Sequence, residues 1–100
     1  MRIVRIIDFT NGEASLASRL TGAHIRNYVE QLLEEGVTVV LDFSGVDLIT
    51  QSFGDELLGV LVRQRSYSEI KGKVKIKNAN SLVKEIIKFV LSYSREAVVA

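Results

Sequence analysis

Cysteine and proline are both absent from the 100-residue chain, and histidine occurs once, as His24. Without thiols there is no disulfide, no thiolate metal site and no cysteine nucleophile. A Ser-His-Asp triad would need His24, which lies far in sequence from the candidate serine, Ser52. A zinc site needs three or four ligands, and one histidine with scattered carboxylates is a poor set. We therefore expect no metal, no cofactor and no catalytic residues.

Phosphate-binding glycine motifs are also missing. No Gly-Lys-Ser/Thr follows Gly54 or Gly59 and no Gly-x-Gly-x-x-Gly occurs, which excludes nucleotide hydrolysis by a P-loop. The 13 basic and 12 acidic residues give a net charge of +1, which is no footprint for nucleic acid or an anionic membrane. No apolar run approaches the roughly 20 residues of a spanning helix. We expect a cytoplasmic protein without a membrane or a specific nucleic acid as its partner.

The spacing of apolar residues predicts alternating strands and helices. Strands are expected at 2–9, 13–17, 37–43 and 71–77, and helices from 18 or 21 to 35, from 53 to 67 and from 80 to 91. No repeat, linker or low-complexity segment interrupts them, so residues 1–100 are expected to form one domain. The Asn11-Gly12 pair favours a tight turn, after which the second strand would pair back on the first.

Residues 37–43, VTVVLDF, form a nearly continuous apolar run, as expected of a central strand covered by helices on both faces. The order βαβαβα, with an additional N-terminal strand, predicts an α/β fold. Three main helices would pack on a mixed sheet of four to five strands. The expected core includes Val39, Leu41, Phe43, Leu57, Leu61, Val74, Ile76, Ile86 and Val90.

Lysines alternate with apolar residues at positions 71, 73, 75 and 77, which is typical of a strand with one wet face. A basic stripe of this kind binds phosphate or RNA in some proteins. No aromatic residue is interleaved to stack on bases, and lysines on an edge strand commonly prevent aggregation. A solvated edge is the favoured interpretation.

The stretch DLITQSFGDE, residues 47–56, joins the central strand to the next helix and carries most of the candidate polar residues. Ser52 followed by Asp55 fits a capping box, so Ser52 is predicted to cap the helix. Asp55 and Glu56 would then lie in its first turn, where negative charge suits the macrodipole. Asp42 ends the central strand and either caps the loop or takes part in a site. An enzyme using Asp42, Asp47 and Ser52 ranks last, because no base pairs with the serine.

Residues 39–62, VVLDFSGVDLITQSFGDELLGVLV, resemble the central strand, loop and helix of STAS domains, which occur in bacterial anti-sigma-factor antagonists and in sulfate transporters. LDFSGV matches the strand end of that family. Where its regulators carry Asp-Ser-Ser/Thr-Gly, with the first serine phosphorylated, this chain has Thr50, Gln51, Ser52 and Phe53. SFGDELLG, together with Ser18-Arg19, is more similar to a STAS-like domain family of unknown function.

The resemblance implies a non-enzymatic regulatory module that docks on a protein partner through residues 47–56. The expected partner-binding or switch residues are Asp47, Thr50, Gln51, Ser52 and Asp55. The alternative is a phospho-switch, modified at Ser52 or Thr50 by a partner serine kinase. The implied partner is a histidine-kinase-like ATPase or that serine kinase, and the protein would be a monomer or a homodimer.

Overall fold

The computed structural model describes the backbone of residues 1–99 and the side chains of residues 1–94. Its main sheet has three parallel strands in the order β1 (Arg2–Arg5), β3 (Val39–Asp42) and β5 (Val74–Lys77). The run 37–43 therefore contains the central strand, as predicted. The expected mixed sheet of four to five strands is wrong, because β2 (Ser15–Leu16) and β4 (Leu48–Ile49) form a separate parallel pair.

The predicted hairpin at the N-terminus does not form, although its turn does. Asn11 and Gly12 both have positive φ, at 55° and 81°. Before this turn, however, the chain leaves β1 and enters a 3-10 turn, η1 (Ile6–Phe9), which buries Ile6 completely. The strand after the turn, β2, then pairs with β4 instead of pairing back on β1. Burial of Ile6 thus ends the first strand earlier than the local pattern indicates.

The first long helix, α1 (Arg19–Glu34), matches the prediction. The Ser18 hydroxyl accepts a hydrogen bond from the Thr21 amide at 3.3 Å and caps its start. Gly36, with φ of 78°, follows its end in the left-handed conformation that glycine adopts without strain. Ile25 and Val29 are fully buried on the side facing the sheet.

The second predicted helix begins two residues earlier than expected and is not uniform. It runs as α2 (Gln51–Gly54), a π-helical segment η2 (Asp55–Gly59) and α3 (Val60–Gln64). A further short helix, α4 (Tyr67–Lys73), follows and is capped by the Ser66 hydroxyl. Lys71 and Lys73 therefore lie in a helix, and only Lys75 and Lys77 lie in β5. The last helix is α5 (Ser81–Val99).

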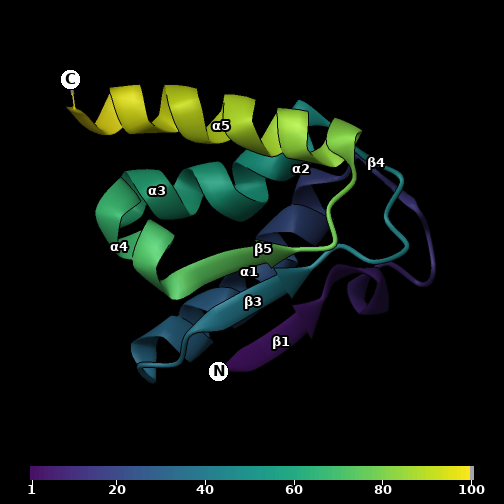
Figure 1. Ribbon diagram of the computed structural model, residues 1–100, viewed down its shortest axis with the longest axis horizontal. Coiled ribbons are helices and arrows are strands. Elements are labelled where there is room, and N and C mark those ends of the chain that lie inside the picture. The colour runs from purple at the N-terminus through teal and green to yellow at the C-terminus, as the bar shows by residue number, and fades with distance from the viewer. Residues whose placement is uncertain (100) are drawn as a thin grey trace.

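The helices lie on one side of the three-stranded sheet (Figure 1). In the figure the sheet faces the viewer, α1 lies behind it, α3 and α5 lie above β5, and no helix of the described residues lies in front. The expectation that helices cover both faces of the central strand is therefore wrong. The side chains of Val40 and Asp42 point to the uncovered face of the sheet. Their exposure is low because side chains of the neighbouring strands β1 and β5 flank them. Among those neighbours Ile3 is 48% exposed.

Most of the predicted core is buried, namely Val39, Leu41, Phe43, Leu57, Leu61, Val74 and Val90. Ile76 is 36% exposed, against the prediction, because β5 is an edge strand. Ile86 is half-buried. None of the helices among the described residues has the length and apolar character needed to cross a membrane.

Candidate functional site

The loop between β3 and α2 is held by backbone hydrogen bonds. The amides of Asp47 and Leu48 donate to the Ala14 carbonyl at 2.8 and 3.3 Å, and the Thr50 amide donates to the Leu16 carbonyl at 2.9 Å. On the other side, the Asn80 side chain donates to the Asp47 carbonyl at 2.9 Å. The side chains of Asp47 and Leu48 are left exposed, Leu48 at 44%. The loop is therefore a fixed frame that presents its side chains to solvent.

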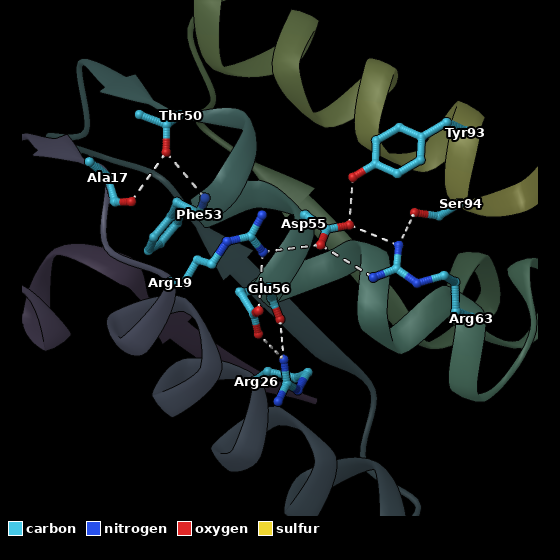
Figure 2. Close-up of polar contacts among 10 residues, drawn as sticks. All are labelled: Ala17, Arg19, Arg26, Thr50, Phe53, Asp55, Glu56, Arg63, Tyr93 and Ser94. Carbon is cyan, nitrogen blue, oxygen red and sulfur yellow. Dashed lines mark hydrogen bonds and ion pairs between the residues drawn. The ribbon is translucent and has the colours of Figure 1, made fainter. Parts of the chain in front are cut away.

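Thr50, and not Ser52, caps the helix. The Thr50 hydroxyl accepts a hydrogen bond from the Phe53 amide at 3.2 Å and donates to the Ala17 carbonyl at 3.4 Å (Figure 2). A cap residue keeps extended backbone just before the helix, as Thr50 does with φ of −84° and ψ of 163°. Ser52 already lies inside the first turn, so the predicted capping box is wrong. The half-buried Ser52 hydroxyl makes no side-chain hydrogen bond within the described part of the chain.

Asp55 is the centre of a polar cluster that joins three helices (Figure 2). Arg63 donates to both of its carboxylate oxygens, at 2.8 and 3.2 Å, and Tyr93 on α5 donates to Oδ1 at 2.5 Å. Arg19 at the start of α1 lies 3.4 Å from Oδ2. The Arg63 hydrogen bonds hold the pKa of this carboxyl below its usual value, although burial acts in the opposite direction. Asp55 thus anchors the helix to its neighbours and is not a free first-turn charge.

Glu56 forms the second half of the cluster, on the side of α1. Arg26 donates to its carboxylate at 2.9 Å and to its backbone carbonyl at 2.6 Å, and Arg19 donates to the carboxylate at 3.1 Å. The hydrogen bond from Arg26 is the main reason why the pKa of Glu56 is lowered. Asp55 and Glu56 both lie in the π-helical segment. There the Val60 amide donates to the carbonyl of Asp55, five residues earlier. π-Helical turns are rare and often occur at functional sites.

Gly59 makes room for the cluster. A Cβ atom at this position would lie 2.5 Å from Oδ1 of Asp55 and 2.8 Å from the Ser94 hydroxyl. Arg63 donates to that same hydroxyl at 2.9 Å. Because no side chain fits between these groups, the arrangement depends on glycine. The close approach lets α5 contact the π-helical turn through polar atoms.

Tyr93 extends the cluster toward the surface. Burial raises the pKa of its phenol, and the neighbouring carboxylate of Asp55 raises it further. The side-chain amide of Gln51 lowers this pKa and so acts in the opposite direction. Gln51 itself is exposed. Tyr93 thus lies near both Gln51 in the exposed first turn of the helix and Asp55 in the cluster.

Asp42 has a separate, structural role. Its Oδ1 accepts three hydrogen bonds: from the Ser44 amide at 2.9 Å, the Ser44 hydroxyl at 2.7 Å and the Asn78 side chain at 3.0 Å. These bonds lower its pKa to about 2. Asn78 has φ of 59°, in the left-handed region, directly after β5. Asp42 thus ties together the carboxyl ends of β3 and β5, which corresponds to the loop-capping alternative.

The structure brings four of the five predicted site residues, Thr50, Gln51, Ser52 and Asp55, onto the first turns of one helix. Asp47 lies on the adjoining loop. The partners of Asp55 and Glu56 were not predicted: they are Arg19, Arg26, Arg63 and Tyr93. Ser94, which accepts a hydrogen bond from Arg63, was not predicted either. Within the described residues no group of histidine and acidic side chains is arranged to hold a metal ion.

The family to which the chain belongs follows from a comparison with protein-family models. The model described as STAS-like domain of unknown function (DUF4325) matches residues 21–84. The chain therefore belongs to this family, in agreement with its α/β fold and with the resemblance in residues 39–62. Searches of the curated proteins and of the solved structures gave no significant match.

Proposed function

We propose that the protein is a non-enzymatic regulatory module that binds a protein partner through residues 47–56. The observation that carries this proposal is that the backbone of the loop is held in place while its side chains are exposed. Main-chain hydrogen bonds to Ala14 and Leu16 fix its position, while Asp47, Leu48 and Gln51 remain exposed. A preorganised surface pays little conformational entropy on binding, which favours recognition.

The polar cluster supports binding rather than catalysis. The carboxylate of Asp55 accepts hydrogen bonds from Arg63, Arg19 and Tyr93, and its lowered pKa makes it a weak base. A general base needs a pKa near the working pH and an accessible proton acceptor. The cluster is instead suited to holding the helix start in one position against α1 and α5.

Site-specific crosslinking tests this proposal. A photoreactive residue, Gln51→p-benzoylphenylalanine, is introduced in cells, with Gln31→p-benzoylphenylalanine on the exposed side of α1 as the matched control. We expect position 51 alone to crosslink to a defined partner, of the histidine-kinase-like ATPase or serine-kinase class. Asp47→Lys, introduced beside the probe, should suppress that crosslink. Equal crosslinking from both positions would refute docking at this surface, and turnover lost in Ser52→Ala would refute a non-enzymatic role.

A second candidate function, a phospho-switch, is favoured by the state of the Ser52 hydroxyl. The Thr50 hydroxyl is engaged as the cap, whereas that of Ser52 makes no side-chain hydrogen bond among the described residues. Ser52 precedes Asp55 and Glu56 by three and four residues, which puts it on the helix face near Arg19. A phosphate on Ser52 would interact favourably with the backbone N–H groups and the dipole at the helix N-terminus. It would also compete with the carboxylates of Asp55 and Glu56 for Arg19.

Mass spectrometry distinguishes this candidate from the first. A partner serine kinase and ATP should add one phosphate to the wild type and none to Ser52→Ala, while Thr50→Ser should remain a substrate. Ser52→Asp should change partner affinity at least tenfold, which is about 1.4 kcal/mol, and Ser52→Asn should not. If the wild type, Ser52→Asp and Ser52→Asn bind the partner with equal affinity, the phospho-switch is refuted and docking without phosphorylation remains as the proposed function.

A further inference from the structure

A groove runs along the free edge of β5 and shares no lining residue with the surface at residues 47–56. It consists of two cavities that share Ile76, one of about 120 Å³ and one of about 350 Å³. The smaller lies toward α4 and is lined by Ile70 and Leu91, among others. The larger lies toward the start of α5 and is lined by Ile87. The smaller cavity is thus mainly apolar, whereas the larger combines the apolar Ile76 and Ile87 with Asn78 and two lysines.

The edge of β5 offers unpaired backbone groups to this groove. The Phe43 amide donates to the Lys77 carbonyl at 2.9 Å, so Lys77 directs its peptide groups toward β3. Successive residues of a strand alternate in this direction, so Ile76 directs its N–H and C=O toward the free edge. The Val74 amide is already used, because it donates to the Ile70 carbonyl. Ile76 therefore supplies both a free donor and a free acceptor.

Positive charge surrounds the groove. Lys84 and Lys88 line the larger cavity and Lys71 lines the smaller, and among the described residues no carboxylate lines either one. Lys75 and Lys77 lie on the strand itself and are exposed. This concentration is local, since the whole chain carries a net charge of only +1. An occupant with acidic side chains would complement this charge.

We propose that the edge of β5 binds an extended segment of a partner protein in which apolar and acidic residues alternate. Such a segment adds a fourth strand next to Ile76, and its apolar side chains enter the two cavities. Its acidic side chains point to the opposite face of the sheet, where they meet Lys75 and Lys77. Four residues of β5 allow about 13 Å of pairing. This surface is distinct from the one at residues 47–56.

A second copy of this chain is a poor occupant of the same edge. Pairing of two β5 strands would bring Lys75 and Lys77 opposite the same lysines of the copy, and like charges across strands are destabilising. Nucleic acid is a poorer occupant, because Tyr67 in the smaller cavity is the one aromatic residue among the described residues that line the groove, and successive bases need a series of stacking surfaces. Lysines at the edge of a sheet oppose pairing with a second copy of the same strand, but they do not oppose pairing with an acidic segment of a partner.

Titration with a synthetic peptide tests the proposal. The probe is an acetylated, amidated eight-residue peptide that alternates valine with glutamate, and the protein is the full chain labelled with ¹⁵N. We expect resonance shifts confined to β5, α4 and the start of α5, and slower hydrogen exchange of the Ile76 amide. The same peptide with N-methyl groups on the residues that face β5 should bind at least tenfold more weakly, since it cannot pair with the edge.

Charge variants supply the second arm. The double variant Lys75→Glu/Lys77→Glu should weaken peptide binding at least tenfold, because both lysines are exposed on the face that the acidic side chains occupy. Asn27→Asp/Gln31→Glu, on the exposed side of α1, and Asp47→Lys should each leave the dissociation constant within twofold. Equal binding of the N-methylated peptide, no binding by the wild type, or the same shifts produced by a single-stranded RNA but not by the peptide would each overturn the proposal. Failure of the docking experiment at Gln51 would not affect these results.

Discussion

Arg63 binds both carboxylate oxygens of Asp55, a residue eight positions earlier in the same helical segment, at 2.8 and 3.2 Å. Residues eight apart are two turns apart, so the arginine must reach back along the helix to make this contact. It does so over Gly59, and its Nη1 also donates to Ser94 on α5. One guanidinium thus links the π-helical turn to the last helix.

Arg63→Ala is expected to destabilise the protein by about 1–3 kcal/mol, because it removes the paired donors of a carboxylate that is only 13% exposed. Arg63→Lys should recover only part of this loss, since an ammonium cannot bind both oxygens in the fork geometry of arginine. Urea unfolding at pH 7 measures both variants. Equal stability of Arg63→Ala and the wild type would mean that Arg19 and Tyr93 satisfy Asp55 without it.

Gly59→Ala should be destabilising by about 1–3 kcal/mol, even though alanine favours helices, because its Cβ would overlap Asp55 and Ser94. Gly72 in α4 provides the matched control, since a Cβ there meets no atom within 4 Å. Gly72→Ala should stabilise the protein by about 0.5–1 kcal/mol through helix propensity alone. Thermal unfolding of the two variants should therefore give shifts of opposite sign.

Thr50→Ala should cost about 0.5–2 kcal/mol, because it removes the acceptor of the Phe53 amide. Ser52→Ala should change stability by less than about 0.5 kcal/mol, as expected of a side chain outside the cap. Thr50→Ser, which retains the hydroxyl, serves as the control and should stay close to the wild type. A larger loss from Ser52→Ala than from Thr50→Ala would contradict this assignment of the cap.

Asp42→Asn should lower the free energy of unfolding by about 1–2 kcal/mol at pH 7, because Ser44 and Asn78 then donate to a neutral oxygen. The pKa of Asp42 is about 2 in the folded protein, below the value of 3.8 for the unfolded chain. Its stabilising effect is thus complete above about pH 4 and disappears as the pH falls to 2. The difference between the variant and the wild type should shrink over this range in urea titrations.

The strands and helices that the sequence predicts correctly are those with strong local patterns. The run VTVVLDF identifies the central strand because both of its faces are apolar, and the stripe from Ile25 to Leu32 identifies α1. The alternating lysines mislead because positions 71 and 73 fit a strand as well as the last turn of a helix. The cap of Ser66 and the burial of Ile70 decide in favour of the helix.

The errors at the candidate site have a different cause, since they depend on contacts far apart in the sequence. Thr50 and Ser52 are equally good cap residues, and the pairing of β4 with β2 determines which of them comes just before the helix. The Asn11-Gly12 turn forms locally, but its strand partner is chosen by tertiary packing. The ligands of Asp55 come from positions 19, 63 and 93, and no local motif joins them.

The loop at residues 47–51 keeps its shape through main-chain hydrogen bonds, which every amino acid except proline can make. Its exposed side chains at Asp47 and Leu48 can therefore be exchanged with little cost to folding. On the docking function proposed above, recognition and stability are carried by different atoms of the same segment. The same proposal predicts that single substitutions at these positions change the partner specificity, without compensating changes elsewhere in the domain.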